Sequence, residues 1–134
     1  MSQKSRLARQ VTLDEAWSSS EHSEICCLIY ATQNGWKLPI LFEEMGVPYD
    51  WALVDFEKGE QRSERFLSIN PNGRIPALID RARGVTVAES GAILEYSAAR
   101  FASPLLLPAD EDLQLHLQTK QWLHWQVSAG SSGR

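Results

Sequence analysis

The chain has 134 residues, 43% of them hydrophobic, which is enough for one folded domain with an apolar core. Its formal net charge of −4 provides no positive field, so we expect neither nucleic acid nor an anionic membrane surface as a partner. No apolar run approaches the roughly 20 residues that span a bilayer, and no signal-peptide core follows Met1, so we expect no membrane segment and no secretory signal.

The first 24 residues are polar and end in the serine-rich run "SSSEHSE". Basic residues near the start weakly resemble a transit peptide, but Asp14 and Glu15 argue against one. We therefore expect residues 1–24 to be a disordered extension.

The run "ICCLIY", residues 25–30, has the length of a strand and is apolar at nearly every position. A strand that is apolar on both sides lies in a sheet covered on both faces. Cys26 and Cys27 then point to opposite faces, where we expect core side chains rather than a disulfide or a nucleophile. With no C-x-x-C and only three scattered histidines, we expect no metal site, and the cytosol is the expected compartment.

A helical pattern follows "TQNG", residues 32–35. Asn34 is the expected N-cap, and Gly46 is expected to end the helix. Pro39 lies deeper than the first helical position and should either remove one backbone hydrogen bond or kink the start of the helix. The apolar residues at spacing i, i+3, i+4 and i+7 are Leu38, Leu41, Phe42 and Met45.

Further elements follow, and the turn "RARG" is short enough to join two of them as an antiparallel hairpin. We expect strands at 48–56, 75–80 and 85–89, a short helix at 63–68 capped by Ser63, a helix capped by Ser90 that runs to about Phe101, and a last helix from Asp110 or Asp112 to about Val127. The order β-α-β-α-β-β-α predicts an α/β, thioredoxin-like domain with a four-stranded mixed sheet and helices on both faces. We place this domain at 25–103, followed at 104–134 by a linker and one further helix.

Pro76 stands almost at the start of its strand, in the segment "NPNGRIPALID". Proline has no N–H for a sheet ladder, and X–Pro bonds adopt the cis form at a modest cost of about 0.5–1 kcal/mol. We predict a cis bond between Ile75 and Pro76, which would turn the N–H and C=O of Ile75 toward solvent for pairing with an extended peptide. By pattern alone, a trans proline that only starts the strand is equally compatible.

Several separated segments closely resemble the amino-terminal domain of soluble glutathione S-transferases. They are "TQNGWKLPILFEEMGVPYDWALVDFEKGEQRSERFLSINPNGRIPALID" and "AESGAILEY", and with "QWLHWQVSAG" they extend over roughly residues 25 to 130. The nearest subgroup resembles the nu-class bacterial enzymes and a related fungal nitrogen-regulation prion protein. In this resemblance the last segment is the first helix of an all-α carboxy-terminal domain, and we expect that domain to be truncated.

The resemblance implies glutathione, γ-Glu-Cys-Gly, as a co-substrate and implies no metal. It assigns the γ-glutamyl carboxylate to the backbone N–H and hydroxyl of Ser90, at a helix start that favours anions, and the neighbouring ammonium to Glu89. A plain capping role for Ser90 is compatible with this assignment. The cysteinyl backbone is assigned to Ile75, beside Pro76. The candidates for the glycine carboxylate are Arg74, Gln61 and, more weakly, Lys37.

Catalysis in this family needs the glutathione thiol as a thiolate, and a helix N-terminus with hydroxyl or amide donors favours that state. The resemblance assigns this role to Thr32 and Asn34. The nu-class sequence resembles Thr-Pro-Asn, whereas this chain has Gln33 in place of the proline, which loosens the turn around Thr32. No tyrosine, serine or cysteine stands at the catalytic position of the other classes, and Tyr30 is expected in the core.

The resemblance leaves three functions open. They are a transferase that adds the glutathione thiolate to an electrophile, a glutathione-dependent disulfide reductase, and a non-enzymatic regulatory or adaptor module. The site residues favour an enzyme, whereas the truncation and the apolar last helix, with Trp122 and Trp125, favour an adaptor. We expect a homodimer, and the cysteine usage makes the cytoplasm the expected compartment. The glutathione half-site should be complete, and the pocket for the second substrate incomplete.

Overall fold

The computed structural model describes residues 7–18, 22–101 and 112–132. The chain forms two compact units, Met1–Ile93 and Leu94–Arg134. The division falls within the third α-helix, whereas the expected boundary between 103 and 104 lies outside the described residues and stays a prediction.

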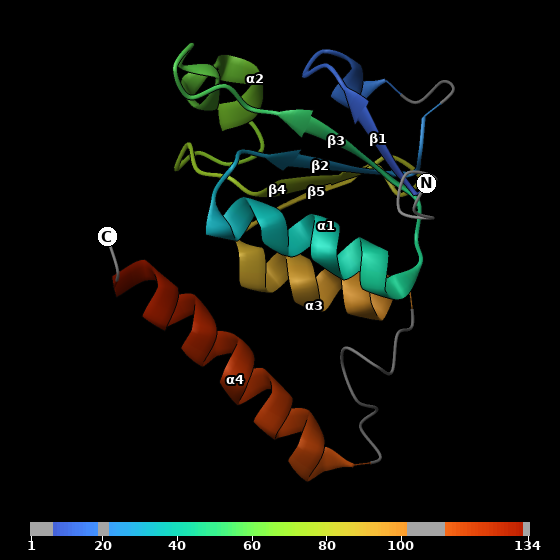
Figure 1. Ribbon diagram of the computed structural model, residues 1–134, viewed down its shortest axis with the longest axis vertical. Coiled ribbons are helices and arrows are strands. Elements are labelled where there is room, and N and C mark those ends of the chain that lie inside the picture. The colour runs from blue at the N-terminus through green and yellow to red at the C-terminus, as the bar shows by residue number, and fades with distance from the viewer. Residues whose placement is uncertain (1–6, 19–21, 102–111, 133–134) are drawn as a thin grey trace. The chain divides into compact units, whose positions relative to one another are not determined.

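The first unit is built on a five-stranded mixed sheet with the order β1-β3-β2-β4-β5 (Figure 1). Its strands are β1 (Ala8–Val11), β2 (Ile25–Ile29), β3 (Tyr49–Leu53), β4 (Ala77–Asp80) and β5 (Val85–Ala88). β3 runs parallel to both of its neighbours, β1 and β2, while β4 is antiparallel to both β2 and β5. This is the predicted thioredoxin-like order, with five strands where the sequence predicted four.

Four α-helices and two short 3₁₀ turns complete the described structure. The helices are α1 (Gln33–Met45), α2 (Glu64–Leu67), α3 (Ser90–Arg100) and α4 (Leu113–Ser132), and the turns are η2 (Glu15–Trp17) and η3 (Glu60–Arg62). Ser63 caps α2 as expected, because its side chain accepts the Phe66 N–H. The hairpin of β4 and β5 also agrees with its prediction.

The fifth strand corrects the expectation of a disordered extension, for the part of residues 1–24 that is described. β1 pairs in parallel with the edge of β3, and η2 follows it. Thr12 and Glu15 form a capping box: the Thr12 N–H donates to Glu15 Oε2 at 2.7 Å, and the Glu15 N–H donates to Thr12 Oγ1 at 3.2 Å. Val11 and Ala16 are buried, and this apolar burial orders a segment that is otherwise polar.

Helix α1 covers one face of the sheet and α2 lies over the other (Figure 1). Every residue of β2 is buried, which confirms the prediction of a strand covered on both faces. Cys26 and Leu28 belong to a core cluster that Phe66 of α2 completes. Cys27, the next residue of the strand, points to the opposite face, and both thiols are free and buried.

Helix α1 begins two residues earlier than its expected cap implies. Its N-cap is Thr32, whose Oγ1 accepts the Gly35 N–H at 3.2 Å. The prediction of Asn34 as N-cap is wrong, because the backbone leaves the extended region directly after Thr32 and Asn34 already lies in the first turn. Gly35 allows this turn to close, since a Cβ there would lie 2.0 Å from the Tyr30 carbonyl oxygen. Gly46 ends the helix in the left-handed region at φ 67°, as expected.

The second unit contains the end of α3 and the whole of α4. Asp112 Oδ1 accepts the Leu115 N–H at 3.1 Å, so Asp112 caps α4, while its alternative Asp110 lies outside the described residues. The helix extends to Ser132, past the expected end near Val127. Among the described helices, none combines the length and the apolar character needed to cross a membrane.

Candidate functional site

One end of the sheet gathers the elements that the sequence analysis selected. Leu28, near the end of β2, pairs with Ala77 at the start of β4, and Ala77 pairs with Ala88 at the end of β5. The turn into α1, the segment before β4 and the start of α3 therefore lie at the same end of adjacent strands. β3 runs parallel to β2 and also ends here, so the segment that carries Gln61 in η3 follows from this end. We call it the site end.

The turn between β2 and α1 presents a helix N-terminus at the site end. The Thr32 backbone N–H donates to the Tyr30 carbonyl oxygen at 2.8 Å, which fixes the turn. The Thr32 hydroxyl accepts the Gly35 N–H, so its own proton remains available for a second partner. No acidic residue lies in the first turn of α1, so no side chain there neutralises the positive end of the helix dipole. The turn is therefore suited to stabilise an anion.

Asn34 and Lys37 follow Thr32 on α1. Asn34 is exposed in the first turn, and Lys37 is half-buried in the next. Partial burial lowers the pKa of Lys37. Within the described residues, no hydrogen bond or ion pair joins Lys37 to Arg74 or Gln61.

The Ile75–Pro76 peptide bond is cis. Pro76 is buried and Ile75 is half-buried. The backbone N–H and C=O of Ile75 make no hydrogen bond to another described residue, so an extended ligand could pair with them. The residue before them is held in place, because Asn70 Nδ2 donates to the Arg74 carbonyl oxygen at 2.8 Å.

Gln61 in η3 packs against the turn that leads into Arg74. Gly73 in that turn has φ 63°, and a Cβ there would lie 3.0 Å from the Gln61 carbonyl oxygen. The side-chain Oε1 of Gln61 is buried, and no described residue donates a hydrogen bond to it. Turning this side chain toward a ligand would therefore break no hydrogen bond of that oxygen. Gln61 and the exposed Arg74 are thus the pair of glycine-carboxylate candidates that the structure brings together.

Glu89 and Ser90 connect β5 to α3. Glu89 has φ 72°, and among the described non-glycine residues it alone has a positive φ. Such a conformation costs about 1–3 kcal/mol and persists where the surroundings fix it, often at functional sites. Ser90 begins α3 and is buried, with 7% of its surface exposed. The Ile93 N–H donates to the Glu89 carbonyl oxygen at 2.9 Å, so Glu89, with its exposed carboxylate, occupies the N-cap position that was expected for Ser90.

The two cysteines are unsuited to nucleophilic chemistry. Burial, with a smaller contribution from the Asp50 carboxylate, raises the pKa of the Cys26 thiol to about 12. Burial raises the pKa of Cys27 as well. Neither residue is a thiolate near neutral pH, so a thiol reaction at this protein needs a sulfur from elsewhere.

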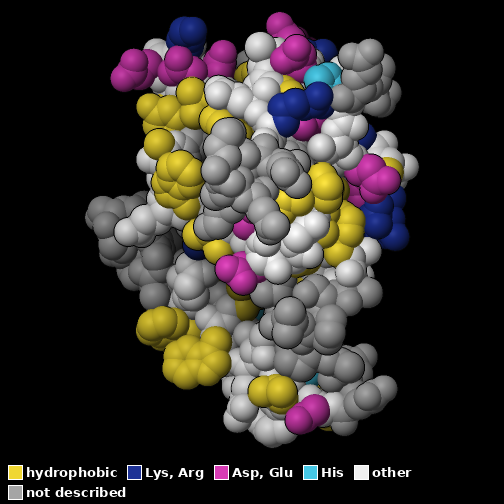
Figure 2. All heavy atoms as spheres, turned by 45° about the vertical axis from the view of Figure 1, so that its right-hand side comes forward, with side chains coloured by type: hydrophobic (Ala, Val, Ile, Leu, Met, Phe, Trp, Pro, Cys, Tyr) yellow, Lys and Arg dark blue, Asp and Glu magenta, His cyan; other side chains and the backbone are white. Residues whose placement is uncertain are grey.

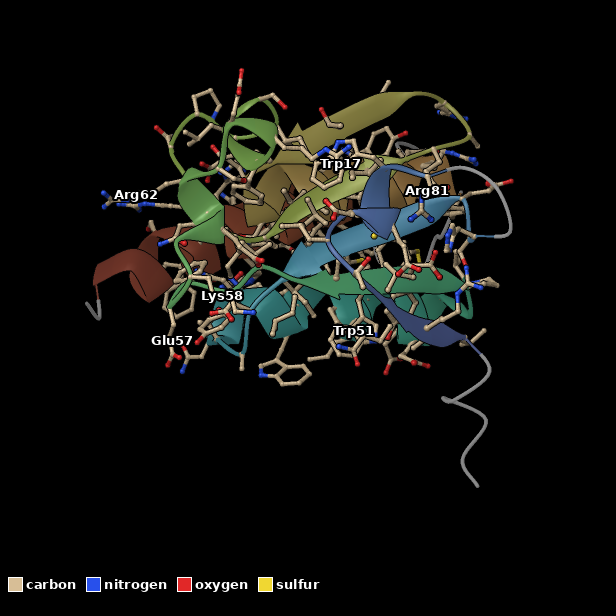
Figure 3. The ribbon with its side chains drawn as sticks, turned by 90° about the horizontal axis from the view of Figure 1, so that it is seen from above. Trp17, Trp51, Glu57, Lys58, Arg62 and Arg81 are labelled. Atoms are coloured by element: carbon tan, nitrogen blue, oxygen red, sulfur yellow. The ribbon has the colours of Figure 1, made fainter. Side chains whose placement is uncertain are left out.

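An apolar cavity of about 290 Å³ lies between α1 and the adjoining strands β2 and β3. Trp51, which Figure 3 labels, is one of its walls. None of the predicted site residues lines it, and the alternation of Tyr49, Trp51 and Leu53 on one face of β3 is the sequence signal that could have located it. The remaining lining residues are Ile29, Tyr30, Ala31, Trp36 and Pro39.

The opposite end of the sheet holds a charged cluster that the sequence analysis missed, and we call it the charged end. The Asp50 side chain is completely buried, with Arg81 Nη1 at 2.7 Å from Oδ2 and Arg9 Nε at 3.1 Å from Oδ1. His22 Nδ1 lies 3.5 Å from Oδ2, and the Ser23 N–H donates to the same oxygen at 3.2 Å. Burial opposes the ionisation of Asp50, but the hydrogen bonds and charges of the two arginines outweigh it and lower the pKa of Asp50.

On the face that Figure 2 shows, Lys and Arg side chains lie among Asp and Glu side chains rather than in one basic patch. A search of the described residues finds no group of three or more His, Cys, Asp or Glu side chains that could hold a metal ion.

Residues 29–99, more than half of the chain, match the family model of the glutathione S-transferase N-terminal domain. The chain belongs to the glutathione S-transferase family. Among curated members, the transcriptional regulator URE2 of Saccharomyces cerevisiae is 39% identical over 100 residues, which cover 71% of this chain and 28% of URE2.

Two solved structures of this family are also similar to the chain. Ure2p in complex with glutathione has a TM-score of 0.76 and 33% identity, covering 87% of this chain and 50% of that one. The glutathione transferase URE2P6 from Phanerochaete chrysosporium, in complex with oxidized glutathione, has a TM-score of 0.75 and 35% identity, covering 82% and 51%. This transferase-family chain thus spans about half the length of these solved relatives and lies near the fungal Ure2 subgroup, as its resemblance implied.

Proposed function

We propose that this chain binds glutathione at the site end and that the bound thiolate acts on a second substrate, either an electrophile or a disulfide. The observation that carries the proposal is the register of β2, β4 and β5. That register brings an uncompensated helix N-terminus, an unpaired backbone edge at Ile75 and the Glu89–Ser90 helix start to one end of the sheet. These are three kinds of partner that a short peptide with an anionic sulfur and an anionic terminus requires.

In the proposed complex each end of the tripeptide has its own partners. The backbone N–H and hydroxyl of Ser90 bind the γ-glutamyl carboxylate, and Glu89 binds the ammonium. The cysteinyl backbone pairs with Ile75 as an added strand. Arg74 and Gln61 bind the glycine carboxylate, supported by the contact between the Gln61 and Gly73 segments and by the partnerless Gln61 oxygen.

The sulfur then faces the start of α1. The Thr32 hydroxyl caps the helix with its oxygen and donates its proton to the thiolate, while the Asn34 side-chain amide supplies a second donor. The helix dipole adds to both and lowers the pKa of the bound thiol below its ordinary value of about 8.5. The absence of acidic side chains from the first turn of α1 supports this role.

Two reactions are open to such a thiolate. Toward an electrophile, it forms a carbon–sulfur bond and expels the leaving group. Toward a disulfide, it attacks one sulfur and expels the other as a thiolate, and a second glutathione then cleaves the mixed disulfide, so the protein needs no cysteine of its own. The buried, high-pKa state of Cys26 agrees with this route, and the complex of URE2P6 with oxidized glutathione supports the disulfide branch.

A second candidate function is a regulatory or adaptor module without catalysis. Trp122 and Trp125 on α4 are 67% and 61% exposed, and their rings form an edge-to-face pair with centroids 5.5 Å apart. Exposed aromatic pairs of this kind mark contact surfaces for other proteins. The relative URE2 is a transcriptional regulator, which supports the same alternative.

Calorimetric titration of glutathione into the folded chain tests the shared step, and saturable binding is the expected result. Assays with a chloronitrobenzene acceptor and with hydroxyethyl disulfide then separate the reactions. Activity that Asn34→Ala removes supports an enzyme, whereas binding without either activity supports the adaptor. A flat titration of a folded, monodisperse sample would exclude the glutathione site itself.

The proposal extends to the expected assembly, a homodimer, and to the compartment expected from the cysteine usage, the cytoplasm. Sedimentation equilibrium of the purified chain tests the dimer. Fractionation of the source cells with an antibody against the chain tests the compartment.

A further inference from the structure

The segment 7–18, which we call the N-terminal strap, lies outside the residues 29–99 that match the family model. It consists of β1, η2 and the residues that join them. Val11 and Ala16 of the strap are buried in the same apolar cluster as Phe66 of α2. The strap therefore extends the sheet with β1, and its η2 part packs into the same core as α2.

Polar contacts also join the strap to α2. Arg65 Nη1 lies 3.1 Å from Asp14 Oδ1, and the Arg65 guanidinium lies 4.7 Å from the centre of the Trp17 ring. Trp17 in turn packs against the shared cluster. Arg65 of α2 therefore forms an ion pair with Asp14 and a cation–π contact with Trp17, and both partners belong to the strap.

The other side of the strap is fixed by the charged end. Arg81 Nε donates to the Ala16 carbonyl oxygen at 3.0 Å, and Arg81 Nη2 donates to the Glu15 carbonyl oxygen at 3.3 Å. Arg81 is itself held by buried Asp50. In Figure 3 the Arg81 side chain lies beside the N-terminal segment. Arg81 therefore holds the strap through contacts that do not involve α2, so the contacts between the strap and α2 can determine the position of α2.

Helix α2 in turn fixes both glycine-carboxylate candidates. Ser63 joins it to η3, because the Ser63 Oγ accepts the Phe66 N–H at 3.2 Å and donates to the Glu60 carbonyl oxygen at 2.7 Å. Gln61 lies within this joined unit. The Phe66 carbonyl oxygen accepts the Asn70 N–H at 3.0 Å, and Asn70 Nδ2 binds the carbonyl oxygen of Arg74. A displacement of α2 therefore moves both candidates.

We propose that the N-terminal strap positions the glycine end of the glutathione site, with Trp17 and Arg65 as the positioning residues. The inference rests on the proposed function, since it names a support for that same site. Neither residue touches the ligand. Their effect reaches Gln61 and Arg74 through α2. Docking of the strap on the sheet and binding of glutathione are therefore coupled, and each equilibrium must favour the other by the same factor.

The experiment compares the full-length wild type with Trp17→Ala, Arg65→Ala and Arg65→Lys. Arg83→Ala is the matched control, because Arg83 is an exposed arginine in the turn between β4 and β5. Calorimetry with glutathione gives the affinity, on samples shown to be folded by circular dichroism. We expect the two alanine variants to bind glutathione about fivefold more weakly or worse, the lower range of coupling between sites. Arg65→Lys should restore most of the affinity, and Arg83→Ala should match the wild type.

Hydrogen exchange supplies a readout that a purely structural role would not move, under conditions where the strap amides exchange by local opening, because a ligand slows a local opening only when that opening weakens its binding. Saturating glutathione should slow exchange of the strap amides of Ala16 and Ser18 in the wild type, although the ligand does not touch them, and this protection should shrink in Trp17→Ala. Unchanged affinity in both alanine variants of a wild type that binds glutathione overturns the inference alone. A wild type that does not bind glutathione overturns the proposed function, and the strap's role at this ligand with it.

Discussion

The two ends of the sheet use polar side chains in opposite ways. At the charged end, buried Asp50 is paired with Arg81 and Arg9, and Arg81 also holds carbonyl oxygens of the N-terminal strap. At the site end, Asn34 and Arg74 are exposed. Gln61 Oε1 is partnerless among the described residues, and so is the Ile75 backbone. The sheet therefore uses its polar groups for internal contacts at one end, while at the other end the polar groups named here have no such partners among the described residues.

The comparison predicts that changes at the charged end destabilise the fold, and the largest effect is expected for Asp50→Ala. This change leaves the Arg81 guanidinium, whose side chain is 5% exposed, without its counter-charge. Removing one partner of a buried ion pair costs about 3–5 kcal/mol of unfolding free energy. Urea denaturation monitored by circular dichroism measures the loss.

Lys58→Ala is the control for that experiment, because the Lys58–Asp55 pair lies at the surface with a separation of 3.9 Å and a lysine side chain 75% exposed. Its loss should cost less than about 1 kcal/mol. Equal effects of the two substitutions would contradict the structural role assigned to the charged end.

The site end should show the reverse pattern, in which binding suffers and stability does not. Ser90→Ala removes a hydroxyl that the proposed function assigns to the γ-glutamyl carboxylate. Hydrogen bonds to charged groups contribute about 1.5–3 kcal/mol, so glutathione affinity should fall by roughly ten- to a hundredfold. Calorimetry measures this change, and thermal unfolding should move little.

Ser97→Ala is a control on the same helix. Ser97 is buried like Ser90, but no described residue forms a hydrogen bond with its hydroxyl. Affinity for glutathione should be unchanged in this variant. If Ser97→Ala weakens binding as much as Ser90→Ala does, the loss reflects the packing of α3 and not a contact with the ligand.

The dependence of stability on pH tests the structural role of Asp50 through a smaller change in the free energy of unfolding. The pKa of Asp50 is lowered in the folded chain, so its contribution to stability is complete above its ordinary value of 3.8 and is lost as the pH falls through the lower folded value. Wild type should therefore lose stability toward acid faster than Asp50→Asn. The gap between their unfolding free energies, measured by urea titration from about pH 7 to about pH 3, should narrow. A gap that stays constant or widens would show that the ionisation of Asp50 does not support the fold.

Most elements of the fold were predictable because their signals are local. The apolar run of β2, Ser63 as a cap and the turn between β4 and β5 each depend on neighbouring residues only. The order of these elements then determines which strand ends meet. The N-cap of α1 was assigned two residues too late, since both Thr32 and Asn34 are good capping residues and only the backbone decides between them.

The charged end and the N-terminal strap were missed because their contacts join distant parts of the chain. Arg81 and Asp50 are 31 residues apart, and no local pattern pairs them. The strap did carry a readable signal, the capping box of Thr12 and Glu15 in "TLDE". The expectation of disorder considered only the polar composition of these residues, and the burial of Val11 depends on the edge of β3, which the sequence does not show.

The weakest effect is expected at Glu89, where the left-handed backbone favours glycine and the proposed ligand contact favours a carboxylate. Its φ of 72° suits glycine, so Glu89→Gly relieves backbone strain while adding chain entropy to the unfolded state. The free energy of unfolding should stay constant or rise by up to about 1 kcal/mol. Glutathione should bind about two- to fivefold more weakly, because an exposed ion pair contributes about 0.2–1 kcal/mol.

Glu89→Gln separates the two effects, since it keeps the strained backbone and removes only the charge. It should weaken binding equally, as measured by calorimetry, with no gain in thermal stability. A tighter-binding Glu89→Gly would mean that the left-handed backbone serves the fold rather than the ammonium of the ligand.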